Sequence, residues 1–184
     1  TTLASGDYSV QATIGGCTGP IGTVSVTVNP TPAAPLASAN TTLCSGSTIN
    51  FTASTVGAST YSWSGPNGFT STNQTPSIVG ATTLATGNYS VYATDLGCQS
   101  SAGVVSVTVI GLPVTPTLSS NSPICLGQIL NLNSSFVSGI VYNWSGPNSF
   151  TSNIQNPSII NSQTLSTGVY SLYLSNSGCQ GLTN

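Results

Sequence analysis

Short stretches of the chain alternate apolar or aromatic residues with polar ones, at the two-residue period of a β-strand whose two faces have different surroundings. The clearest examples are residues 48–55, 60–64, 89–94 and 104–109. Residues 65–68, Gly-Pro-Asn-Gly, supply turn chemistry between two of these stretches. No stretch keeps a helical period with capping residues. The pattern therefore predicts short strands joined by turns.

The alternation is itself repeated, because residue i and residue i+81 match from one end of the chain to the other. Tyr8, Tyr89 and Tyr170 are in step, as are Trp63 and Trp144. The stretch YSWSGPNGFTSTNQTPSI at residues 61–78 returns as YNWSGPNSFTSNIQNPSI at residues 142–159. A fixed period of this size is typical of a tandem domain array.

About six to eight short strands within each repeat predict an all-β fold of tandem immunoglobulin-like antiparallel β-sandwich domains. Proline-rich junctions, NPTPAAP at 29–35 and GLPVTP at 111–116, divide the chain. We expect the C-terminal strands of a preceding repeat at 1–31, a complete repeat at 32–112, and a repeat lacking its last strand at 113–184. Extended X-Pro linkers act as stiff spacers, so successive domains are expected to lie end to end in a longer array.

Aromatic residues are the candidate core. A single Trp on a central strand is typical of the core of a sandwich, and a Gly-x-Tyr step before a strand is typical of a tyrosine corner. The expected core residues are Trp63, Trp144, Tyr8, Tyr89 and Tyr170. The alternative is that the Trp side chains stack on a sugar ring. The GPNGF and GPNSF segments are expected to be tight turns, because Gly, Pro and Asn suit such turns, and the alternative is that they are ligand-binding loops.

Five cysteines follow the same period. Cys44 and Cys98 are separated by the same interval as Cys125 and Cys179, which predicts one disulfide inside each repeat and leaves Cys17 without its partner. Each bridge would stabilise a repeat by about 4 kcal/mol through loop entropy. Metal binding is the alternative, but the cysteines have no CxxC spacing and the chain has no His. Disulfides indicate an oxidising, extracytoplasmic location.

Composition excludes several functions. The 184 residues include no Lys, Arg, His or Met, and the only carboxylate side chains are Asp7 and Asp95. Nucleic acid is a poor partner for a chain with no basic residue, and no apolar run is long enough to insert into a membrane. No cofactor is expected. A Ser or Thr nucleophile would have no His or Lys to activate it, so the chain is not expected to be an enzyme. The two Asp residues are not repeated, and a calcium site needs several oxygen ligands with more charge, so no metal site is expected.

A family resemblance rests on five motifs in order. They are LCSG at 43–46, YSWSGPNGF at 61–69, TGNYSV at 86–91, LGCQS at 96–100 and VSVTV at 105–109. This order resembles the Ig-like or PKD-like repeats of large secreted Bacteroidota surface proteins, among them the gliding-motility adhesins of the SprB type. The resemblance implies export by type IX secretion, display at the cell surface, and adhesion, with the repeats forming a stalk.

Two non-catalytic functions fit the sequence. The first is an extended stalk and multivalent adhesive surface of an extracellular adhesin, whose partners are further repeats of the same chain and surface polysaccharide. The second is a building block of a self-associating extracellular filament or sheath, in which neutral Ser, Thr and Asn faces pack without charge repulsion.

Overall fold

The computed structural model describes residues 4–57 and 60–184, and these form an all-β fold, as the alternation predicts. Turns, irregular segments such as residues 27–36 and 111–117, and single-turn 3-10 helices join the strands of the described chain. The chain forms two compact units, one of residues 1–41, 49–78 and 87–107 and one of residues 42–48, 79–86 and 108–184. The limits 31/32 and 112/113 expected for the repeats stay a prediction.

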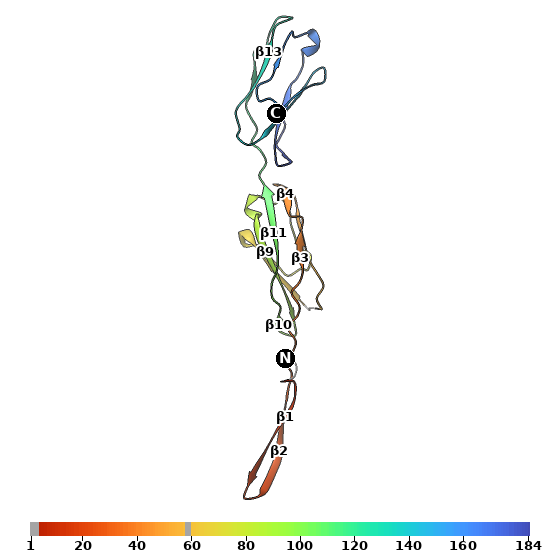
Figure 1. The fold of residues 1–184 in the computed structure, drawn as a ribbon, viewed down its shortest axis with the longest axis vertical. Coiled ribbons are helices and arrows are strands. Elements are labelled where there is room, and N and C mark those ends of the chain that lie inside the picture. The colour runs from red at the N-terminus through yellow and green to blue at the C-terminus, as the bar shows by residue number, and fades with distance from the viewer. Residues whose placement is uncertain (1–3, 58–59) are drawn as a thin grey trace. The chain divides into compact units, whose positions relative to one another are not determined.

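The chain begins with a two-stranded hairpin, β1 (Gly6–Ile14) and β2 (Cys17–Val26), drawn in red in Figure 1. Tyr8 is opposite Val24, and the turn residues Gly15 and Gly16 both have positive φ, as a two-residue hairpin turn requires. No third strand joins this sheet among the described residues. The apolar side chains of the hairpin are therefore largely exposed, including Tyr8 at 51 %, so the core position expected for Tyr8 is wrong.

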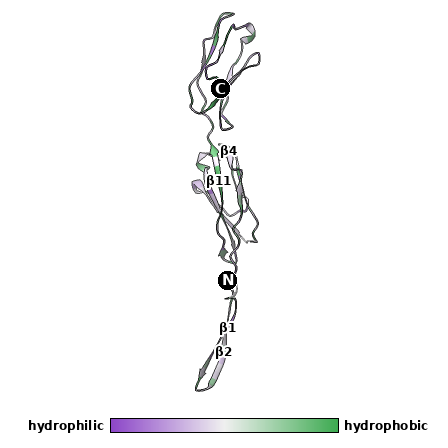
Figure 2. Ribbon diagram, viewed as in Figure 1, coloured by the Kyte–Doolittle hydropathy of each residue, from purple (hydrophilic) through white to green (hydrophobic). Residues whose placement is uncertain are grey.

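The second repeat folds as two mainly antiparallel sheets. One has the order β3-β5-β8 and the other β4-β11-β9-β6-β7, with β10 paired to β9. The strands are β3 (Ala37–Ala39), β4 (Thr42–Cys44), β5 (Ile49–Ala53), β6 (Thr60–Ser64), β7 (Thr70–Ser71), β8 (Ser77–Ile78), β9 (Gly87–Asp95), β10 (Cys98–Gln99) and β11 (Gly103–Ile110). The one parallel pair in these sheets joins β4 to the end of β11. Figure 2 shows this end of β11 as one of the more hydrophobic parts of the ribbon.

Aromatic side chains form the core of the second repeat. Phe51 on β5 lies against Trp63 and Tyr89, with ring centroids 5.3 Å and 4.5 Å apart. Trp63 is 1 % exposed and Tyr89 is fully buried. Alternate residues of β5 and β9 face this core, which explains their two-residue pattern.

The GPNGF turn is part of this packing. Pro66–Gly68 form the 3-10 helix η2, in which Asn67 has φ 53°. A Cβ on Gly65 would overlap the Tyr89 ring, and Phe69 meets the same ring edge-on at 5.5 Å. The motif is thus a turn that packs on the tyrosine, which accounts for its return at residues 146–150.

The third repeat has the sheets β12-β13-β16 and β15-β14-β17-β18. Its strands are β12 (Leu118–Ser120), β13 (Leu130–Ser134), β14 (Val141–Gly146), β15 (Phe150–Ser152), β16 (Ser158–Ile159), β17 (Ser171–Asn176) and β18 (Cys179–Gln180). Its core consists of Leu130, Leu132, Tyr142, Trp144, Leu172 and Leu174. Trp144 is 3 % exposed and donates its indole N–H to the Gln155 carbonyl at 3.2 Å.

Tyrosine corners occur where the Gly-x-Tyr steps predict them. The hydroxyl of Tyr170 donates to the Ser166 carbonyl at 2.8 Å, and that of Tyr8 to the Ala4 carbonyl at 2.9 Å. Ser166 ends the 3-10 helix η4 (Thr164–Ser166), and η3 (Thr83–Ala85) is its counterpart one repeat earlier. Among the described residues, no helix has the length and apolar character needed to cross a bilayer.

Candidate functional site: a disulfide between successive repeats

Cys44 is positioned by the parallel pairing of β4 with β11. It is the last residue of β4 and the strand neighbour of Ile110, and the next amide, that of Ser45, donates to the Ile110 carbonyl at 2.8 Å. Gly46 then reverses the chain at φ 93°, a conformation that favours glycine. The thiol of Cys44 is therefore held beside the C-terminal end of β11.

Cys179 is positioned by a tight hairpin turn in the third repeat. Ser177 and Gly178 both have positive φ, which is the geometry of a type I′ turn, and Cys179 pairs with Asn176 across it. Cys179 is 2 % exposed. Strand β18 thereby holds its sulfur in one orientation.

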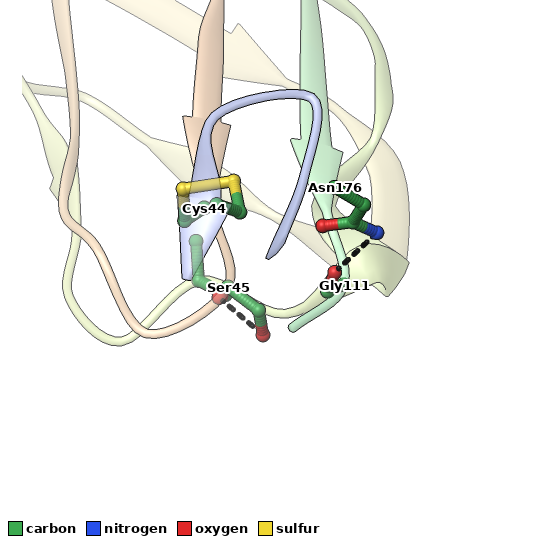
Figure 3. The surroundings of a disulfide bond; sticks show 6 residues. Cys44, Ser45, Gly111 and Asn176 are labelled. Carbon is green, nitrogen blue, oxygen red and sulfur yellow. Dashed lines mark hydrogen bonds between the residues drawn. A yellow bond between two sulfur atoms is a disulfide. The ribbon is translucent and has the colours of Figure 1, made fainter. Parts of the chain in front are cut away.

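These two cysteines form a disulfide, with Cα atoms 5.5 Å apart and a sequence separation of 135. Beside the bridge, the side-chain amide of Asn176 donates to the Gly111 carbonyl at 3.2 Å (Figure 3). By sequence, Cys44 belongs to the second repeat and Cys179 to the third. The bridge therefore links successive repeats.

The predicted pairs Cys44–Cys98 and Cys125–Cys179 are wrong, because Cys98 and Cys125 are both free thiols, as is Cys17. The reason is strand length. Cys98 lies at the turn that leads into β11, whereas Cys44 pairs with the last residue of that strand. An eight-residue strand spans about 26 Å, and a disulfide tolerates a Cα separation of at most about 7 Å.

Cys98 occupies the same local site as Cys179, one repeat earlier. Leu96 and Gly97 form its positive-φ turn, and its thiol donates to the Asn29 carbonyl at 3.7 Å. Asn29 aligns with Ile110, the strand neighbour of Cys44. Cys98 therefore lies beside the end of the preceding repeat. Cys179 lies beside the end of the repeat before it in the same way, and there it meets Cys44.

Thiol mapping tests this pairing. We expect alkylation of the unfolded, unreduced chain to label Cys17, Cys98 and Cys125, and reduction to release Cys44 and Cys179 as well. Peptide mass spectrometry of the unreduced chain should find one linked peptide pair, containing Cys44 and Cys179. Labelling of Cys17 alone would contradict this pairing and would support the pairs Cys44–Cys98 and Cys125–Cys179.

No cluster of three or more His, Cys, Asp or Glu side chains occurs within residues 4–57 and 60–184. Asp7 lies on the exposed hairpin and accepts a hydrogen bond from Ser25, while Asp95 is half-buried at the end of β9. The two Asp residues are on separate elements, the hairpin and the second repeat. The described residues therefore present no group of carboxylates that could act together.

Burial raises the pKa of the Tyr89 and Tyr170 hydroxyls above the ordinary value of 10.0, because the phenolate would lose its hydration. A raised folded-state pKa means that the folded protein holds the proton more tightly than the unfolded chain. We therefore expect stability from these two groups to be complete below pH 10.0 and to fall as the pH rises beyond it. Urea unfolding at a series of alkaline pH values measures this, and a Tyr170→Phe variant should show a smaller loss.

No protein-family model matches the sequence. No curated protein matches it either. Solved structures do match by fold. A chain of the mouse coronavirus receptor-binding domain complex with its murine receptor is 13 % identical over 80 % of this chain and 96 % of its own, with a TM-score of 0.50. Murine CEACAM1b is 15 % identical over 83 % and 96 %, with a TM-score of 0.46. Extracellular domains 3–5 of Drosophila OTK are 16 % identical over 100 % and 70 %, with a TM-score of 0.43.

Identities this low concern the fold alone. Two facing antiparallel sheets, a buried Trp on a central strand and tyrosine corners agree with the first of these similarities. The disulfide is typical of secreted or extracellular proteins. The chain has an all-β, immunoglobulin-like fold.

Proposed function

We propose that this chain is a non-catalytic segment of an extracellular, cell-surface adhesin, in which tandem Ig-like repeats act as an extended stalk and multivalent adhesive surface. The observation that carries the proposal is the Cys44–Cys179 bridge between successive repeats. A disulfide within one sequence repeat protects that repeat alone, whereas one that joins two successive repeats also holds them together under load. The latter suits a stalk that transmits tension.

Because the sequence repeats every 81 residues, the same disulfide link is expected at every junction between repeats. Cys98 lies beside the residue that aligns with Ile110, and Cys125 aligns with Cys44. In a longer array, Cys98 pairs with the preceding repeat and Cys125 with the following one. A continuous series of covalent links then runs along the stalk, and weak contacts through Ser, Thr and Asn faces add up to avidity for surfaces such as polysaccharide. Gliding motility and type IX secretion belong to the same proposal through the resemblance of the repeat motifs.

Pulling a single oxidised molecule by its two ends tests the load-bearing role. The bridge shields the residues between positions 44 and 179 from extension, so the fully unfolded oxidised chain should reach a total length of only about 170 Å, against about 640 Å after reduction. Cys44→Ser should give the long extension without reductant. An oxidised molecule that extends fully would show that the bridge carries no load.

Small-angle X-ray scattering tests the stalk separately. A compact protein of 184 residues has a radius of gyration of about 16 Å. We expect a value well above this for the oxidised chain. A value near that of a compact protein would contradict an extended stalk without affecting the disulfide pairing.

A further inference from the structure

The larger sheet of the second repeat turns one face to the core and the other to solvent. Along β6 and β9, the inward residues include Trp63, Tyr89 and Val91, which are all buried. The residues between them face outward, and each is exposed or half-buried. Where β6 and β9 pair, the outward residues are Thr60, Ser62, Ser64, Ser90, Tyr92 and Thr94, and we name them the tyrosine face.

Tyr92 lies at the centre of the tyrosine face. Ser62 is directly opposite it across the strand pair. Ser64 pairs with Ser90 on one side of it, and two Thr residues pair on the other side. Side chains directly opposite have Cβ atoms about 5 Å apart, and diagonal neighbours about 7 to 8 Å apart are still within reach of an aromatic ring. One aromatic ring is therefore surrounded by short hydroxyl side chains.

The third repeat places an aromatic ring at the same position. Tyr173 on β17 faces outward and is half-buried, opposite Asn143 on β14. Ser145 and Ser171 pair beside it, as the aligned Ser residues do in the second repeat. In the second repeat the face is flanked by β7 and β11, which are both present, so the exposure of Tyr92 is a property of the complete sheet. The core does not require an aromatic residue at this outward position, so its return has another reason.

The hydroxyl groups of inward and outward tyrosines differ in their hydrogen bonding. Those of the inward Tyr61, Tyr142 and Tyr170 each form a hydrogen bond with a backbone group. Those of Tyr92 and Tyr173 have no hydrogen-bond partner within residues 4–57 and 60–184. A phenol whose donor and acceptor are both unused can bind a ligand through its ring and its hydroxyl together. The two outward tyrosines therefore keep their polar group available to a ligand.

The chemistry of the tyrosine face favours an uncharged ligand that is rich in hydroxyl groups. None of its residues is charged, and Asp7 and Asp95 both lie outside it. A charged partner would lose hydration there without gaining an opposite charge. A protein partner would lack the cluster of apolar residues that forms the centre of such interfaces. A neutral polysaccharide suits the face, because its C–H groups pack on an aromatic ring and its hydroxyls bond to Ser and Thr hydroxyls.

We propose that the tyrosine face binds a neutral polysaccharide, with the ring of Tyr92 packed on a sugar ring and the hydroxyls of Ser62 and Ser64 bonded to sugar hydroxyls. The corresponding face around Tyr173 binds the same polymer. The site depends on the adhesive function proposed above, to which it adds a ligand class and a location. Weak binding at each face becomes avidity along the array. The pulling and scattering results would stand even if no polysaccharide bound.

Biolayer interferometry of the oxidised chain on immobilised dextran, laminarin, xyloglucan and galactomannan tests the binding. We expect the chain to bind at least one of these neutral polymers, and we expect the double variant Tyr92→Ala, Tyr173→Ala to bind it at least about tenfold more weakly. Phe136→Ala is the control, because Phe136 is an exposed aromatic residue outside the face, and it should change binding little. Binding to none of the four polymers, or an equal loss in the control, would overturn the proposal.

A second pair of variants keeps the test valid if removal of the two rings unfolds the chain. Ser64→Asp with Ser145→Asp changes exposed, aligned residues beside the two rings. It should weaken binding at least about fivefold, because a carboxylate under the sugar loses its hydration. Thr52→Asp with Asn133→Asp adds the same charge at exposed, aligned positions of the smaller sheets and should change binding little. Equal effects of the two pairs would contradict a site on the tyrosine face.

Nuclear magnetic resonance locates the bound sugar, and sedimentation identifies a competing occupant. On addition of an oligosaccharide of the polymer that binds, the ring signals of Tyr92 and Tyr173 should shift, while those of the inward Tyr61 and Tyr170 should not. Binding should change by no more than about twofold between low and high salt, because no charge takes part. If the chain instead self-associates, loses this association in Tyr92→Ala and binds no polysaccharide, the face is a contact between copies and the proposal is wrong.

Discussion

Cys44→Ser is expected to lower the free energy of unfolding of the oxidised chain by about 5 kcal/mol. The Cys44–Cys179 bridge closes a loop with a sequence separation of 135 residues, and the loop-entropy model assigns about this value to a loop of that size. Urea unfolding followed by tryptophan fluorescence measures it, since Trp63 and Trp144 report separate repeats.

Cys125→Ser is the matched control for this loss. Cys125 is exposed and free, so its substitution should change the free energy of unfolding by no more than about 0.5 kcal/mol in the isolated chain. Reduction of the wild-type protein should reproduce the Cys44→Ser result. A Cys98→Ser variant as unstable as Cys44→Ser would instead indicate a bridge inside the second repeat.

Trp63→Ala is expected to cost about 3 to 5 kcal/mol, enough to unfold the second repeat or bring it close to unfolding. Trp63 is 1 % exposed and its ring lies 5.3 Å from that of Phe51, so truncation leaves a large cavity in a core built from a few aromatic rings. Thermal unfolding followed by circular dichroism measures the loss.

Phe136→Ala provides the comparison, because Phe136 is also aromatic but 74 % exposed. We expect its effect to stay within about 0.5 kcal/mol. If Trp63→Ala lowered the stability by no more than Phe136→Ala does, the indole of Trp63 would contribute little to the core. Because the Trp63 side chain is buried, its ring is not available to stack on a sugar.

Local pattern was sufficient to predict much of the fold. The strands expected at 48–55, 60–64, 89–94 and 104–109 correspond to β5, β6, β9 and β11, since a strand with one face in the core alternates by two residues. Turn chemistry marked the reversals between strands. The 81-residue period then implied that the second and third repeats share one architecture.

The core prediction holds for Trp63, Trp144 and Tyr89, but it is wrong for Tyr8. Tyr89, Tyr170 and Tyr8 have the same local sequence, yet one is fully buried, one is half-buried and one is 51 % exposed. A tyrosine corner is a local structure, formed by a hydroxyl and a carbonyl four residues apart. Burial requires a second sheet and a neighbouring strand, which come from distant parts of the chain.

The sequence by itself determined the strands, the turns, the repeat and the absence of the side chains that most catalysis requires. It could not determine the pairing of the cysteines, because a period relates Cys44 to Cys179 as regularly as it relates Cys44 to Cys98. Only the tertiary structure decided between them. Strand β11 separates Cys44 from Cys98 by its own length, while parallel pairing with β4 and the tight turn before β18 bring the sulfurs of Cys44 and Cys179 together.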